Sequence, residues 1–338
     1  MKFNTRKKFD AYTARVAALS GVSIAAVLFA VEPSVSQTME TRITDSSDFL
    51  KSINVVPVDE IKGDKIGLGI SRTIAGRTNT NTTDRAPTEL HDLTSNQYEC
   101  KKTEFDWSVK YSTLDSWAKF EDFETRLRNA VLKQMGLDRI MIGWNGTSAA
   151  TQSNRGSNPL LQDVNIGWLQ HIRDDAPEQH LNAVKVGTGP ASPDYKNLDA
   201  AVLDAVELLH ETVRDNPDLV VICNRTLLSD EYVTLAGEQT APTEKMAFHK
   251  MLSNKKVGGL PVVEVPYFPA KAFLITTLDN LSIYYQDGSR RRKIDDNAKR
   301  DQIEDYNTVN EAYVVEEYQA AAFVDGILVP DSAGTAWE

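Results

Sequence analysis

One stretch of the chain repeats apolar residues with the period of a long amphipathic helix. Over residues 114–135, apolar side chains recur every three or four positions, and this spacing keeps them on one helical face. They are Leu114, Trp117, Phe120, Phe123, Leu127, Val131 and Met135. Gly136 can end this helix and leave residues 138–144 as a strand, or the helix can continue to Gly143. The other face is charged, so we expect a structural helix and not a site.

Residues 53–112, ahead of this helix, show the alternation of β-strands on either side of a polar segment. Residues 53–70 alternate around a turn at 62–64, and residues 104–111 alternate again. Between them, residues 71–97 are rich in Thr, Asn, Arg, Gly and Asp, and a loop of this length is uncommon in a compact domain. We therefore expect one long hairpin that projects from the body and is ordered by a partner.

The second half of the chain mixes helices with antiparallel strands. The pattern predicts helices at 159–172, 197–213, 226–236 and 243–254, and strands at 219–224, 260–268, 272–278 and 312–324. Asp287-Gly288 predicts a hairpin turn. Because no series of βαβ units is present, the predicted class is α+β.

Charge divides the chain into a basic start and an acidic remainder. The formal net charge of the 338 residues is −11, and residues 1–30 contribute +4, which leaves −15 for the rest. An acidic body disfavours binding to DNA phosphates. The two cysteines, Cys100 and Cys223, are far apart in the sequence and favour a reducing compartment over a disulfide framework.

The basic start has two interpretations: a secretory signal peptide, or a segment that is not an export signal. Lysine and arginine residues precede the apolar run at 21–31, which is the order seen in a secretory signal peptide. Asp10 and Arg15 interrupt that order, and the run is too short to span a membrane. Glu32-Pro33-Ser34 ends the pattern abruptly, so the segment is predicted to be removable under either interpretation.

No catalytic, cofactor-binding or metal-binding constellation is recognisable. Gly67 and Gly69 lack the third glycine of a nucleotide-binding loop, and His210-Glu211 is followed by Arg214 where a zinc protease needs a second histidine. The other histidines are dispersed along the chain. We predict that the protein is not an enzyme and needs no cofactor or metal.

The run Arg290-Arg291-Arg292-Lys293 is the one basic cluster in the acidic body. Beside the predicted turn it would lie at a hairpin tip. It has three interpretations: a solvated tip, a set of contacts to carboxylates of a neighbouring copy, and, least favoured, a nucleic-acid contact.

Taken in order, these parts resemble a tailed-phage major capsid protein of the Hong Kong 97 type. The amino-acid sequences of many segments are similar to those of the peduovirus branch of that family, and the similar segments cover nearly the whole chain. They are VEPSV at 31–35, SSDFL at 46–50, INVVPV at 53–58, KIGLG at 65–69, SNPLLQDVNIGWLQ at 157–170, NPDLVVI at 216–222, LPVVEVPYFPA at 260–270 and LDNLSIYY at 278–285.

The resemblance implies the α+β capsid fold of that type with six parts. These are a cleavable, scaffold-like leader at 1–30, an N-arm at 31–52, an extended hairpin called the E-loop at 53–112, a peripheral domain with the spine helix at 113–175, an axial domain at 176–311, and a C-terminal strand that returns to the peripheral domain, with a tail, at 312–338.

The resemblance also implies a function. Copies would assemble as pentamers and hexamers into an icosahedral shell that encloses double-stranded DNA without sequence-specific binding and without a membrane. Partners would be a scaffold and protease protein and a portal protein, with assembly in the host cytoplasm and maturation cleavage near Phe29, Ala30 and Val31. The candidate contacts between subunits are Lys62, Asp64, Arg72, Arg77, Arg85, Arg290, Arg291 and Arg292.

Two other classes of function stay open on the residues alone. The first is an exported enzyme or binding protein whose leader is a true signal peptide, which the location of the mature chain would reveal. The second is a cytoplasmic oligomeric binding module that uses residues 71–97 as its ligand loop, which a small, fixed oligomer would favour.

Overall fold

The computed structural model describes residues 1–65, 75, 77–80, 82, 84–85, 97–117, 120, 122–187, 193–228, 256–330 and 336–337. The helices are α1 (Phe3–Leu19), α2 (Pro33–Asp45), α3 (Asp48–Ser52), α4 (Tyr111–Trp117), α5 (Phe123–Asn145), α6 (Trp168–Asp175), α7 (Leu198–Val206) and α8 (Glu211–Arg214), with short 3-10 turns at Pro177–Gln179, Leu278–Asn280 and Tyr318–Ala320. The strands are β1 (Phe29–Ala30), β2 (Asn54–Val58), β3 (Lys62–Asp64), β4 (Gln97–Glu99), β5 (Lys101–Glu104), β6 (Trp107–Lys110), β7 (His180–Asn182), β8 (Val220–Cys223), β9 (Lys256–Val257), β10 (Leu260–Glu264), β11 (Phe273–Thr276), β12 (Leu281–Gln286), β13 (Arg291–Asn297), β14 (Gln302–Val315) and β15 (Ala322–Asp325).

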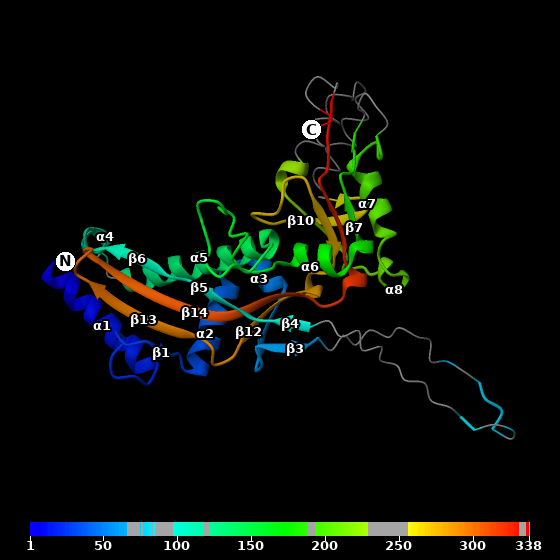
Figure 1. The fold of residues 1–338 in the computed structure, drawn as a ribbon. Coiled ribbons are helices and arrows are strands. Elements are labelled where there is room, and N and C mark those ends of the chain that lie inside the picture. Colours follow the sequence, from blue (N-terminus) through cyan, green and yellow to red (C-terminus); the bar gives the residue numbers. More distant parts are fainter. Residues whose placement is uncertain are drawn as a thin grey trace.

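The long strand β14 organises an elongated first sheet. Strands β12 and β13 pair with successive halves of one edge of β14, while β5 and β6 pair with its other edge. Strand β2 lies outside β12 and β1 lies outside β13. Helix α5 runs along this sheet, and the N-terminus lies at the far end of the elongated body (Figure 1).

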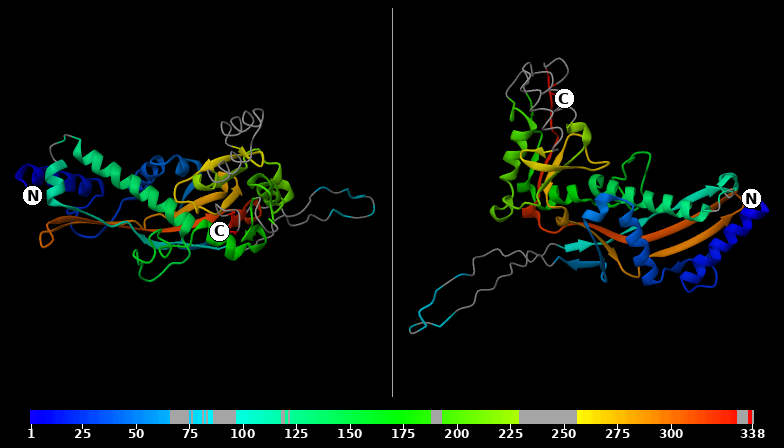
Figure 2. Two further views of the ribbon diagram at one scale, coloured as in Figure 1. Left: turned by 90° about the horizontal axis from the view of Figure 1, so that it is seen from above. Right: turned by 180° about the vertical axis from the view of Figure 1, so that it is seen from behind.

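A second, six-stranded sheet stands upright from the elongated body, as the right-hand view of Figure 2 also shows. Its central strands are buried on both faces, because alternate side chains point in opposite directions. In β8, for example, Ile222 packs in the core of the first sheet, whereas Val221 and Cys223 pack against α7. This explains the continuous apolar run at 219–223, and it makes the two parts share their cores.

Aromatic packing fixes the junction between α5 and α6. Trp144 and Trp168 meet edge to face with ring centroids 4.8 Å apart, and Phe49 and Phe268 lie against Trp144 at 5.3 and 4.9 Å. The Trp168 indole nitrogen donates a hydrogen bond of 2.9 Å to the Ser282 carbonyl oxygen. The approach needs glycine at position 143, since a Cβ there would lie 2.2 Å from the Trp168 ring.

The long helix differs from the predicted one at its start. Helix α4 ends at Trp117 and α5 begins at Phe123, so a single helix from residue 114 is wrong. Of the two predicted ends, continuation to Gly143 is confirmed, since the helix runs on to Asn145, and the alternative strand at 138–144 is wrong. Gly136 does not end the helix but allows close packing, because a Cβ there would lie 2.7 Å from Ser46 Oγ.

Two predicted turns are also wrong. Residues 62–64 form strand β3, which pairs with β4, while β2 pairs with β12. Strands β12 and β13 run in the same direction along β14, so residues 287–290 make a kink between them and not a hairpin tip. The chain reverses between Asn297 and Gln302 instead. Local turn propensity does not show whether the chain reverses at 287–290 or between 297 and 302, because pairing with the long strand β14 decides this.

The strand pairing does not support the predicted boundary between an axial domain that ends at 311 and a C-terminal strand that begins at 312. Residue 311 lies inside the uninterrupted strand β14, and β12 to β14 all belong to the first sheet. The last strand, β15, belongs to the second sheet and does not return to the first. Of the helices predicted at 226–236 and 243–254, only residues 226–228 lie within the described part, and they are helical.

We predict that Gly143→Ala destabilises the subunit by about 1–3 kcal/mol, because the added methyl group must displace the buried Trp168 ring. Denaturant unfolding of the purified subunit measures this free energy. Gly156→Ala is the control, since its methyl group would meet only the end of one side chain in an exposed loop. Equal stability of both variants would contradict the packing role of Gly143.

Candidate cleavage and assembly site

The leader lies on the outer edge of the first sheet. Helix α1 buries Phe9 and Ala17 in an apolar cluster that also contains Leu114, Ile294 and Ile303 of the body. In Figure 1, α1 and β1 lie beside β13 at the end of the molecule that holds the N-terminus. The leader is therefore a docked element of the subunit with a small core of its own.

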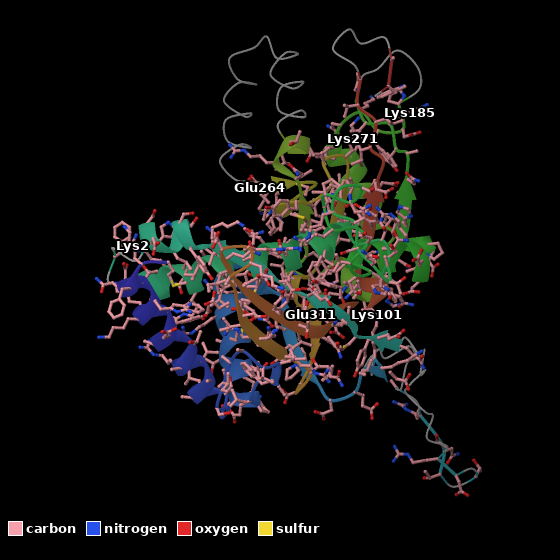
Figure 3. All side chains as sticks on the ribbon, turned by 60° about the vertical axis from the view of Figure 1, so that its left-hand side comes forward. Lys2, Lys101, Lys185, Glu264, Lys271 and Glu311 are labelled. Carbon is pink, nitrogen blue, oxygen red and sulfur yellow. The ribbon has the colours of Figure 1, made fainter. Side chains whose placement is uncertain are left out.

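Polar contacts anchor α1 at several points. The Lys2 backbone nitrogen donates to Asp115 Oδ1 at 2.8 Å, and Lys2 is labelled at this outer end in Figure 3. Arg6 forms an ion pair with Asp296, which also accepts a hydrogen bond from the Tyr111 hydroxyl. That hydrogen bond raises the pKa of Tyr111 to about 12.

The three residues predicted for cleavage form and follow strand β1. Phe29 and Ala30 pair with Arg292 and Arg291, and the Val31 nitrogen donates 2.9 Å to the carbonyl oxygen of residue 290. Phe29 and Val31 are only 7% and 4% exposed, whereas Ala30 is exposed. The structure thus brings the predicted cleavage segment beside the predicted basic cluster.

The basic cluster is divided by the alternation of its strand. Arg290 is 1% exposed and binds Glu40 and Asn307, the latter at 3.0 Å. Arg292 binds Asp305 at 2.6 Å. Both guanidinium groups form ion pairs within the chain, so the structure gives no support to Arg290 and Arg292 as contacts with a neighbouring copy. Arg291 alone of the three arginines is exposed.

Arg290 belongs to a buried ionic cluster with Arg139, Glu40 and Glu311. Arg139 Nη1 and Nη2 bind both oxygens of Glu40, at 2.6 and 3.0 Å, and its Nε and Nη2 bind Glu311 Oε1 at 3.0 and 2.5 Å. All four residues are at most 3% exposed. Figure 3 labels Glu311 in the interior. The cluster joins α2, α5, β14 and the segment before β13, with two charges of each sign.

The pKa values of the two buried carboxyl groups shift in opposite directions. Burial by itself would raise the pKa of Glu40, but the charges of Arg139 and Arg290 outweigh burial and lower that pKa. Burial raises the pKa of Glu311. Of the two arginines, Arg139 is the one that donates hydrogen bonds to Glu311. Glu40 is therefore the carboxylate whose charge the folded state stabilises.

Sequence analysis missed this cluster, although the pattern carries a signal for it. Arg139 lies four residues after Met135, where the apolar stripe of the helix continues. Glu311 falls on the inward face of its strand, between Val309 and Tyr313. A charged residue at an apolar position of a regular pattern predicts a buried ionic partner, but it does not say which residue that partner is.

A second set of polar contacts joins helix α6 to the second sheet. Arg173 on α6 binds Asp325 on β15 at 2.7 Å, and His180 on β7 lies 3.0 Å from the other oxygen of Asp325. Phe323 stacks on the His180 ring at 5.2 Å and lies under the Arg173 guanidinium at 4.9 Å. This contact ties the upright sheet to α6, which itself lies against β14 of the elongated body.

The base of the projecting hairpin is anchored by a buried lysine. Lys65 Nζ donates 2.9 Å to the Val315 carbonyl oxygen and lies 4.6 Å from the centre of the Tyr318 ring. Burial lowers the pKa of Lys65. Just before it, β3 pairs with β4 alone among the described strands. The hairpin thus leaves the body at a fixed point.

The other predicted contact residues lie on this hairpin. Lys62, Asp64, Arg77 and Arg85 are exposed, and Gln97 donates 3.0 Å to Asp64. The described segment 77–80 lies well away from the body (Figure 1). Arg72 lies outside the described residues.

Among the described residues, no cluster of three or more potential metal ligands is present. Within the same part of the chain, no helix is long and apolar enough to cross a membrane. Cys100 and Cys223 are free and buried, and burial raises the pKa of each thiol to about 12. Neither thiol has the character of a nucleophile.

Comparison with known proteins decides what this arrangement is. Residues 8–327 match the family model described as phage major capsid protein, P2 family. The chain belongs to the P2 family of phage major capsid proteins. It is 46% identical over 347 residues to the capsid proteins of Escherichia phage P2, across 98% of this chain and 96% of that protein. It is 40% identical over 344 residues to the major capsid protein of Serratia phage KSP20, across 98% and 99% of the two chains.

The fold of this capsid protein agrees with the family. A chain in the solved satellite phage P4 procapsid including size determination (Sid) protein matches with a TM-score of 0.80 and 44% identity, covering 98% of this chain and 99% of that one. The predicted α+β fold of the Hong Kong 97 type is confirmed, as is the predicted function of forming the icosahedral head shell of a phage. The family is structural and not enzymatic, and the alternative of an exported protein finds no support.

We predict that Glu40→Gln destabilises the subunit by about 3–5 kcal/mol at neutral pH, because two buried guanidinium groups would then face one carboxylate. Since the folded-state pKa of Glu40 is lowered, its contribution is present above the ordinary carboxyl pKa and is lost as the pH falls through the folded value. The gap between wild type and variant should narrow below about pH 4.

Denaturant unfolding at a series of pH values measures that gap. Asp45→Ala on the same helix is the control, because Asp45 is exposed and its replacement should change stability by no more than about 0.5 kcal/mol. A gap that does not depend on pH would show that the charge of Glu40 is not the stabilising feature.

Proposed function

We propose that this capsid protein assembles with its leader attached, in groups of five and six copies, and that a protease removes residues 1–30 during maturation. The observation that carries this proposal is the position of the leader. The two main apolar cores receive no residue before Met39, and the leader residues share only the small outer cluster. Loss of the leader would leave both cores intact.

A structural relative supports a precursor shell. The matching chain comes from a procapsid that includes a size determination protein. By analogy, we infer that this chain forms a precursor shell in the host cytoplasm, with a scaffold and protease protein and a portal protein as partners. The acidic body would enclose double-stranded DNA without adhering to it, since like charges repel.

The projecting hairpin is proposed to lie over a neighbouring copy. Two strands paired only with each other are marginally stable in water, and β3 and β4 have no third strand among those described. A neighbouring subunit would supply the missing contacts. On this proposal Lys62, Asp64, Arg77 and Arg85 are contact residues, and Arg291 on the opposite part of the body is a further one.

The strand pairing suggests a revised division into parts. We assign 1–30, including β1, to the leader, 31–52 to the N-arm, 59–65 and 97–100 to the base of the E-loop, the rest of the first sheet with α5 to the peripheral domain, and the second sheet with α7 to the axial domain. The chain enters the axial domain after α6 and returns to the first sheet at β12.

We predict that Arg77→Glu with Arg85→Glu lowers the yield of closed shells several-fold without changing subunit stability. Each exposed ion pair contributes at most about 1 kcal/mol, but every copy in the shell would lose it. Sedimentation of assembly reactions measures the yield. Lys133→Glu with Lys256→Glu makes the same change of charge at exposed positions of the body and is the control. Equal yields would remove the hairpin arginines from the interface.

The maturation proposal is tested by electron microscopy and intact mass of particles produced with and without the phage protease. We expect closed shells in both cases and, with the protease, loss of about 30 residues from the N-terminus, because that is where β1 ends. Particles that keep the full-length chain in the presence of active protease would overturn the proposed cleavage.

A further inference from the structure

The proposed cleavage segment is inaccessible to a protease while the leader is docked. A protease binds its substrate as an extended strand and needs both a free backbone edge and accessible side chains. Here the backbone of β1 is paired with β13, and the side chains of Phe29 and Val31 are buried. Of the three residues, Ala30 alone presents its side chain to solvent. A bond in this segment cannot be cut in place.

The closure depends on the whole leader because β1 has only two residues. Upstream, the Ala25 carbonyl oxygen accepts a hydrogen bond of 2.9 Å from the Ile294 nitrogen, so the leader follows β13 beyond β1. Phe9, 8% exposed, anchors α1 in the same apolar cluster as Phe29. Release of α1 would therefore weaken the support of β1.

Docking leaves much of the leader's apolar surface uncovered. Leu19, Ile24, Val27 and Leu28 are 55–64% exposed. A cavity of about 520 Å³ also lies between α1, α2 and α5, lined in part by Val16, Val35 and Val131. An element with incomplete packing opens locally at lower free energy than the main cores. The leader is built to detach while the body stays folded.

We propose that the docked leader protects its own cleavage segment, and that release of α1 and β1 from β13 is the step that admits the protease. This inference rests on the proposed cleavage near Phe29, Ala30 and Val31. It makes leader removal depend on whatever detaches the leader, so that a subunit with a docked leader stays uncut even where a protease is present.

The closed state can be opened by a single substitution. Phe9→Ala removes the largest buried side chain of α1 without touching the segment to be cut. Pancreatic elastase, which cuts after small aliphatic residues, is the probe on the purified full-length subunit, and intact mass measured after reduction reports cuts after Ala30 or Val31; cuts in the exposed turn at 26–28 are not counted. We expect cutting to be roughly tenfold faster or more, since cleavage follows the population of the open form. Phe3→Ala, the same truncation at a position that is 84% exposed, should match wild type.

A disulfide can hold the segment closed. Because residues 31 and 290 are joined by a hydrogen bond, Ala30 and Arg291 form a non-hydrogen-bonded pair, whose Cα atoms lie about 4.5 Å apart in antiparallel sheets. That spacing suits a disulfide, and both residues are exposed. The two native cysteines are buried and far from the pair in sequence.

We therefore expect that Ala30→Cys with Arg291→Cys, added to Phe9→Ala and oxidised, abolishes the rapid cut, and that the same protein reduced and capped with iodoacetamide regains it. Phe9→Ala cut no faster than wild type, or an oxidised pair cut as fast as the capped one, would overturn the proposal. Cooperative unfolding of each variant confirms that the body is folded.

The same cysteine pair separates this inference from the proposed function. Particles of the cysteine pair are assembled without the phage protease, oxidised or left reduced, exposed to the protease, and fully reduced before intact mass is measured, because the disulfide would otherwise hold a cut leader on the body. The reduced pair should lose the leader, and the oxidised pair should keep the full-length chain. Wild-type particles that never lose the leader contradict the proposed cleavage. Oxidised particles that lose it as wild type does contradict the protection by docking.

Discussion

The buried contact between Arg139 and the two glutamates Glu40 and Glu311 is the interaction on which the peripheral domain depends. It joins the N-arm helix to the spine helix and to the central strand of the sheet, and Arg290 completes a neutral cluster. Buried charges are costly unless each is paired, so the cluster tolerates only one alignment of these elements. A core of apolar groups alone would permit sliding along the long sheet. The ionic cluster fixes the register.

The second sheet is held by a different device. Its central strands are buried on both faces, so they pack into the core of the elongated body on one side and against α7 on the other. Arg173, Asp325 and His180 then tie this sheet to α6. A shell subunit needs this stiffness, because an error in the angle between its two parts would be repeated at every symmetry-related contact.

The two ends of the subunit have the opposite character. The leader and the projecting hairpin both extend from the rigid body, and each contributes few residues to its main cores. A leader with incomplete packing can be removed without loss of the fold, and a hairpin that lacks a third strand has a reason to seek a neighbour. Rigidity in the body and unsatisfied surface at the ends suit a chain that acts only in many copies.

The sequence by itself determined the α+β class, the amphipathic character of the long helix, the continuous apolar strand predicted at 219–224 and the family, because each depends on local periodicity or on the order of similar segments along the chain. Only the tertiary structure decided that Gly136 permits packing, that residues 287–290 are a kink, and that Arg290 and Arg292 form ion pairs within the chain. The physical reason is that turn propensity and charge describe a residue's own preference, whereas pairing and burial depend on partners that lie far away in sequence. Glu40 and Arg139, which are 99 positions apart, show this most clearly.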